Sequence, residues 1–156
     1  MNPKGNVPAL VLADGTLLNE GAATLQWIAD QAPASGLAPP HGSSARYLLI
    51  NALNYLASEL HASYGPLFNP AITEEGRAAA LAKLHTKLAY VNGGGIPQVK
   101  PDAPIDVASL YLYIILSWSG YVKADLSAYA ALNAFSAKIA AHPVVIEAHK
   151  QMNEAK

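Results

Sequence analysis

Two places in the sequence carry groups that could bind an anion or hold a proton. Glu20-Gly21 stands where a helix is expected to begin, and the first amides of a helix can bind an anion at the positive end of its dipole. His61 shares a polar but almost uncharged helix face with Asn54 and Ser58, which is unusual for a solvated surface. Each group also has an ordinary interpretation. Glu20 would then be a solvated first-turn carboxylate, and His61 a partly buried histidine bonded to a neighbour.

The composition restricts the chemistry open to these groups. The 156 residues contain no cysteine, which excludes disulfides, thiolate metal sites and a cysteine nucleophile, and the five histidines have no spacing typical of a metal site. The net charge is −1 without a run of Lys or Arg, so nucleic acid and anionic membranes are not expected partners. No signal peptide is recognisable, and the longest apolar run, Leu110 to Leu116, is too short to cross a bilayer. We therefore expect a soluble cytoplasmic protein.

The N-terminal residues predict a hairpin followed by a helix. Val7-Pro8 is held extended and leads into a short apolar strand over 9–12. Asp14-Gly15 predicts a two-residue type I′ turn, after which 16–18 returns antiparallel. A helix is expected over 22–30. Its apolar face would consist of Leu25, Ile28 and Ala29.

A Pro-, Gly- and Ser-rich linker at 33–43 separates this unit from a region with helical periodicity. Helices are expected over 44–63, from a Thr73 cap to Gly93, from an Asp106 cap to 122, from Asp125 or Ser127 to His142, and over 143–154. Their buried stripes would be Leu49, Leu53, Leu56 and Leu60; Leu81, Leu84, Leu88 and Val91; and Leu132, Phe135 and Ile139. The helix after Asp106 is apolar nearly all round, which predicts the central helix of a bundle.

This order of signals resembles a known family. Residues 2–10 read N-P-K-G-N-V-P-A-L, a D-G hairpin follows, and L-N-E-G at 18–21 opens a helix. The pattern is similar to the second half of the thioredoxin-like domain of glutathione S-transferases, most closely the bacterial beta class. The region after the linker is similar to the family's helical C-terminal domain, with matches that include 59–61 and 142–145. The resemblance implies a mainly α fold with a truncated thioredoxin-like hairpin plus helix (1–32), the linker (33–43) and an all-helical domain (44–156).

The resemblance also implies a binding site for glutathione as co-substrate. In the family the proline that matches Pro8 is cis, and the residue that matches Val7 bonds the cysteinyl backbone of glutathione through its main chain. The residues that match Glu20 and Gly21 hold the γ-glutamyl end, where the carboxylate binds the amino group and the helix amides bind the carboxylate. The second substrate would be a small apolar electrophile.

The family's first β-α-β unit has no counterpart in these 156 residues. In the family that unit carries the Tyr, Ser or Cys that activates the thiol, whose pKa of about 8.5 leaves little thiolate at neutral pH. His61 matches a beta-class histidine near the thiol and is the remaining candidate catalytic residue, although Ala62 replaces the lysine that commonly follows it. We therefore expect impaired conjugation. In the alternative, Met1 is an internal methionine of a longer reading frame.

Other expectations concern partners. Without the first unit the outer edge of the first strand is unpaired, and an apolar edge can pair with another chain. A non-catalytic binding or scaffold protein that uses this edge is therefore the alternative to an enzyme. The resemblance implies a homodimer formed through the helices that begin at Ala22 and Ser44. Trp118 and Tyr113 either line an acceptor pocket or belong to the core.

Overall fold

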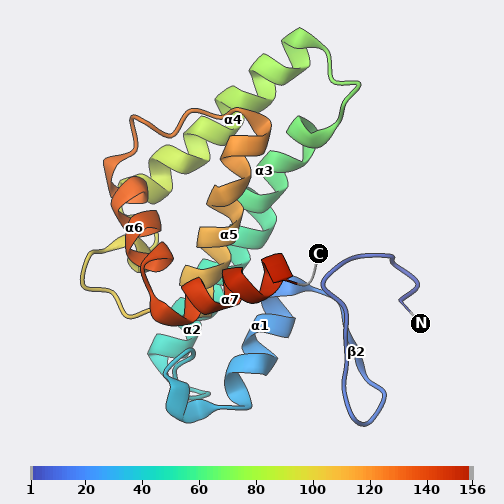
Figure 1. The fold of residues 1–156 in the computed structure, drawn as a ribbon, viewed down its shortest axis with the longest axis vertical. Helices are drawn as coiled ribbons and strands as arrows, with labels where there is room; N and C mark the ends of the chain where they lie inside the picture. Colours follow the sequence, from blue (N-terminus) through green and yellow to red (C-terminus); the bar gives the residue numbers. More distant parts are fainter. Residues whose placement is uncertain (1, 155–156) are drawn as a thin grey trace.

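The structure, a computed structural model that describes residues 2–154, consists of a small hairpin beside a bundle of helices (Figure 1). The strands are β1 (Leu10–Val11) and β2 (Leu17–Leu18), and the longer helices are α1 (Gly21–Asp30), α2 (Ser44–Tyr55), α4 (Glu74–Asn92), α5 (Val107–Val122), α6 (Ala130–Ala140) and α7 (Pro143–Glu154). A π-helical stretch, Leu56–His61, here called the π segment, continues α2 and leads into α3 (Ala62–Tyr64). Short 3-10 turns occupy Pro33–Ser35, Gly65–Phe68 and Pro97–Val99. The predicted mainly α fold is confirmed.

The hairpin has the predicted strands but a different turn. Leu10 pairs with Leu18, and Val11 pairs with Leu17. The expected type I′ turn is wrong, because it needs positive φ at both central residues and Gly15 has it (86°) while Asp14 does not. The Gly15 amide donates to the Leu12 carbonyl, and the Leu12 amide donates to the Thr16 carbonyl. The connection is therefore a three-residue loop that ends on a left-handed glycine.

Helix α1 begins and ends within one residue of its prediction, but one of its apolar residues does not face the core. Ala29 is buried and Leu25 packs against the core, whereas Ile28 is 49% exposed. The end of α1 is tied to the start of α2 by Arg46, whose guanidinium donates to both carboxylate oxygens of Asp30 at 2.8 Å. This pair fixes α1 against the helical bundle across the 33–43 linker.

The expected helix over 44–63 is present, but it is not a regular α-helix throughout. Ser43 caps it by accepting a hydrogen bond from the Arg46 amide. Its predicted stripe is buried: Leu49, Leu53, Leu56 and Leu60. The backbone widens into the π segment at 56–61, and π turns inside helices are frequent at functional sites. His61 is the last residue of that segment and has an exposed side chain.

Two of the predicted caps on the later helices are confirmed. Thr73 accepts from the Gly76 amide at the start of α4, and Asp106 forms a reciprocal capping box with Ser109 at the start of α5. Helix α5 is the central helix, as predicted, because it packs against α1, α2, the π segment and α6 (Figure 1). Gly93 ends α4, and Pro143 opens α7.

The predicted start of α6 is wrong. The helix begins at Ala130 rather than at Asp125 or Ser127. The Asp125 carboxylate accepts both the amide and the hydroxyl of Ser127, at 2.8 and 2.9 Å, so it closes a tight turn instead of capping a helix. The interior of α6 follows the prediction: Leu132, Phe135 and Ile139 are buried. Within residues 2–154 no helix is both long and apolar enough to cross a membrane.

Candidate functional site

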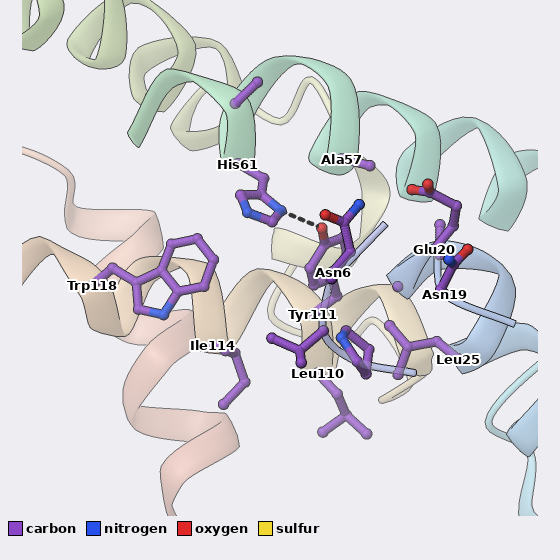
Figure 2. A pocket seen from close by; sticks show the side chains of 16 residues that line it. Asn6, Asn19, Glu20, Leu25, Ala57, His61, Leu110, Tyr111, Ile114 and Trp118 are labelled. Atoms are coloured by element: carbon purple, nitrogen blue, oxygen red, sulfur yellow. Dashed lines mark hydrogen bonds between the residues drawn. The ribbon is translucent and has the colours of Figure 1, made fainter. Parts of the chain in front are cut away.

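An open pocket of about 950 Å³ lies between the segment before β1, the start of α1, the π segment and α5 (Figure 2). All five residues singled out from the sequence line it: Val7, Pro8, Glu20, Gly21 and His61. The other lining residues are Gly5, Asn6, Asn19, Ala22, Leu25, Ala57, Ala62, Leu110, Tyr111, Ile114 and Trp118. Three segments that are far apart in the sequence therefore share one concave surface, which is the usual form of a small-molecule site.

Val7 and Pro8 form one rim of the pocket. The peptide bond between them is cis, as the family resemblance implied. The Val7 side chain is 88% exposed, so its packing does not occupy the pocket. What Val7 offers a ligand is main-chain hydrogen bonding, since each backbone unit carries one donor and one acceptor.

The start of α1 forms a second part of the pocket. Glu20 is the N-cap residue, but its side chain does not cap the helix and instead forms an ion pair with Lys4 at 2.9 Å. Both side chains are more than half exposed, so this pair is weak enough to yield to a competing ligand ammonium. Gly21 and Ala22 follow, and amides in the first turn have no partner within the helix. A carboxylate beside free amides can hold a group that carries both charges, such as an α-amino acid.

His61 enters the pocket from the π segment, and its ring lies between Tyr111 and Trp118 (Figure 2). Its Nδ1 atom is 2.7 Å from the Tyr111 hydroxyl oxygen, and its ring meets that of Trp118 edge-on with centroids 4.8 Å apart. Partial burial lowers the pKa of His61 below its ordinary value of about 6.5. The imidazole is therefore neutral at neutral pH, so it offers one N–H donor and one acceptor rather than a fixed positive charge.

Tyr111 is a pocket residue that the sequence did not single out. It lies on α5, whose apolar character all round hides which side faces a cavity. Burial, followed by the nearby Glu20 charge, raises the pKa of Tyr111, so the phenol keeps its proton. A Cβ atom built on Gly21 would lie 4.0 Å from the Tyr111 oxygen, so this hydroxyl lies between the start of α1 and His61.

An apolar wall completes the pocket on the other side of His61. Trp118 and Ile114 line it, and the Phe68 ring packs edge-on against Trp118 at 5.9 Å. Of the two aromatic residues left open by the sequence, Trp118 lines the pocket and Tyr113 does not. Tyr113 lies on another side of α5, where its hydroxyl is 3.1 Å from Nε2 of His149. Among the described residues no group of three His, Asp or Glu side chains is placed to hold a metal ion.

The comparisons with known proteins agree on one family. The chain is 41% identical over 153 residues to glutathione S-transferase GstA of Escherichia coli O157:H7, a match that spans 95% of this chain and 74% of that protein. The structure of a sphingomonad glutathione S-transferase complexed with glutathione superimposes with a TM-score of 0.88 at 44% identity, covering 96% of this chain and 75% of the other. A beta-class glutathione S-transferase of Sphingomonas chungbukensis gives 0.87 at 38% identity, with coverages of 96% and 75%. No family model matches the chain.

Proposed function

Because the chain belongs to the glutathione S-transferase family, we propose that its pocket binds glutathione as co-substrate and transfers the thiol to an electrophile. The observation that carries the proposal is the convergence of Val7, Pro8, Glu20, Gly21 and His61 on one pocket. A solved relative with glutathione bound shares this fold, which supports the choice of ligand.

The γ-glutamyl end of glutathione would bind at the start of α1. Its ammonium would replace Lys4 beside the Glu20 carboxylate, and its carboxylate would accept from the first amides of α1 at Gly21 and Ala22. The cysteinyl backbone would pair with the main chain of Val7. These assignments direct the sulfur toward His61, which lines the same pocket from the π segment.

His61 would stabilise the sulfur as a thiolate. A free thiol of pKa about 8.5 is only partly ionised at neutral pH, so a positioned donor is needed to favour the anion. A neutral His61 supplies one N–H, and the thiol proton leaves to water. The thiolate then attacks an electrophilic carbon, so that a C–S bond forms as the leaving group departs, or attacks a peroxide oxygen, so that an S–O bond forms as the alcohol or water leaves. Trp118 and Ile114 give the electrophile an apolar surface, which favours a small apolar substrate.

We further propose that conjugation by the 156-residue polypeptide is weak. The γ-glutamyl contact is exposed, since the Glu20 side chain is 65% accessible, and Val7 is 88% exposed. Ala62 supplies no positive charge beside His61. A conjugation assay of the purified chain beside the Escherichia coli relative tests this point. Equal turnover by the two proteins would contradict the impairment.

Glutathione titration followed by calorimetry tests the binding proposal directly. Saturable binding is expected, and Glu20→Ala should weaken it about tenfold, the effect of losing one charge-assisted contact. Glu147→Ala, an exposed carboxylate on α7 outside this pocket, is the matched control and should leave the affinity unchanged. Absence of saturable binding, or equal effects of the two variants, would refute the proposal.

One observation favours a second, non-catalytic role. Among the described residues β1 pairs only with β2, and Val11 on β1 is 64% exposed, so the strand offers an edge for pairing with another chain. A family-type homodimer through α1 and α2 is part of the main proposal, supported by the exposure of Ile28, Tyr47 and Leu48. Light scattering of wild type and Tyr47→Asp tests the dimer, and hydrogen exchange of β1 tests the edge. A monomer with a fast-exchanging β1 would argue against both associations. Cytoplasmic location stays a prediction.

A further inference from the structure

Tyr111 and His61 form a contact that the proposed function does not yet use. The 2.7 Å separation of the Tyr111 hydroxyl and His61 Nδ1 joins the central helix to the end of the π segment (Figure 2). The two rings are nearly perpendicular, at 82°. This geometry holds the imidazole by one of its two nitrogens and leaves the other free to meet a ligand.

The direction of this hydrogen bond decides which nitrogen of His61 carries its proton. Among residues 2–154 the Tyr111 hydroxyl has no hydrogen-bond partner other than His61 Nδ1. A donated Nδ1–H would leave the phenol proton of Tyr111 without a protein acceptor in a partly buried site. The consistent arrangement is therefore Tyr111 O–H donating to Nδ1. In a neutral imidazole the proton then resides on Nε2, because the bond made by one ring nitrogen sets the state of the other.

We infer that Tyr111 is a positioning residue, which fixes His61 in the tautomer whose Nε2–H points its single donor at the sulfur of the bound thiol. Tyr111 acts through His61 and does not itself touch the sulfur. The catalytic consequence rests on the proposed function, whereas the tautomer is a property of the chain without ligand. The failure of one can therefore be distinguished from the failure of the other.

The sequence supplies a matched control two residues away on the same helix. Tyr113 is also partly buried, and its hydroxyl lies 3.1 Å from Nε2 of His149, so it forms a second Tyr–His pair that does not line the pocket. Tyr111→Phe and Tyr113→Phe each remove one oxygen and keep the ring. The two variants therefore share any general effect of losing a hydroxyl from α5, and they differ only in the histidine that is released.

Two-bond ¹H–¹⁵N correlation spectra of the labelled chain at pH 8, without glutathione, test the tautomer. His61→Gln assigns the His61 signals among the five histidines. Wild type should show a protonated Nε2 and an unprotonated Nδ1. In Tyr111→Phe the difference between the two nitrogen shifts should fall as the ring exchanges between tautomers, and Tyr113→Phe should leave these signals in place. A protonated Nδ1 in wild type, or unchanged signals in Tyr111→Phe, would overturn the inference.

Steady-state kinetics test the consequence for the reaction. Loss of one positioning hydrogen bond should lower kcat about three- to tenfold in Tyr111→Phe and leave KM for glutathione within about twofold. Tyr113→Phe should match wild type in both constants. A changed tautomer with an unchanged kcat would restrict Tyr111 to a structural role and refute its part in the reaction. If wild type conjugates nothing, the proposed function fails, and the spectra still decide whether Tyr111 sets the tautomer.

Discussion

Arg46 allows a sharp test of how α1, and with it the Glu20 end of the pocket, is held on the bundle. The residue is 2% exposed and donates to both oxygens of Asp30 at 2.8 Å and to the Pro39 carbonyl at 3.1 Å. Removal of one partner of a fully buried ion pair costs about 3–5 kcal/mol. The Asp30 side chain is 27% exposed and also contacts His41, so water and His41 compensate it in part. We therefore expect Arg46→Met to lower the free energy of unfolding by about 2–3 kcal/mol.

Urea unfolding followed by circular dichroism measures this loss as a lower midpoint at an unchanged m-value. Lys150→Met is the control, because Lys150 forms an exposed pair with Glu154 at 4.0 Å and its loss should cost less than about 0.5 kcal/mol. In a double-mutant cycle, Asp30→Asn should couple with Arg46→Met by about 1–2 kcal/mol. A loss below about 0.5 kcal/mol for Arg46→Met, or additive effects with Asp30→Asn, would refute this account of the pair.

The same pair predicts a pH dependence. The hydrogen bonds from Arg46 lower the pKa of Asp30 in the folded chain below its unfolded value of about 3.9. A carboxylate with a lowered pKa contributes stability that is complete above the unfolded value and is lost as the pH falls through the folded value. The stability difference between wild type and Arg46→Met should therefore be constant near neutrality and shrink below about pH 4. A difference that stays constant down to pH 2 would contradict the assignment.

Three further changes probe the core, a helix cap and the apolar wall. Leu60→Ala, at a position with no exposed surface, should cost about 2–5 kcal/mol in urea unfolding, and a loss below 1 kcal/mol would mean that the site collapses around the cavity. Asp106→Ala removes the capping box of α5 and should cost about 1–2 kcal/mol; Asp125→Ala, which only opens a surface turn, should lower the thermal midpoint less. Trp118→Ala should raise KM for an apolar electrophile about tenfold and leave glutathione affinity unchanged, and equal changes in both would argue against separate subsites.

Much of the fold could be predicted from local patterns. The stripe from Leu49 to Leu60 and the caps at Thr73 and Asp106 depend on residues within a few positions of each other, and all of them occur as expected. The errors arise where two local preferences compete. At Asp125 the side chain bonds the residue two positions on, which removes it as a helix cap. At Asp14 the dipeptide with Gly15 suits more than one hairpin loop, and the three-residue form is present.

The candidate site could be predicted only in part, for a physical reason. Glu20, Gly21 and His61 could be named because a helix start and a polar helix face are visible in sequence. Tyr111 could not, because its role depends on the angle at which α5 crosses the π segment, and that angle is set by packing between residues far apart in the chain. Its neighbour Tyr113 has the same residue type on the same helix and faces another histidine.

The π segment bears on how this pocket can change during evolution. A π turn holds one residue more than the α turn it replaces, so a relative without it would align with a one-residue gap between Leu56 and His61. Loss of that residue would rotate the chain that follows by about 100° about the helix axis. The rotation would take His61 away from Tyr111 and would also take Tyr64 away from Ser119, its hydrogen-bond partner at 2.7 Å. Substitutions in this stretch can therefore accumulate one at a time, whereas a single deletion would remove the pocket histidine and a core contact together.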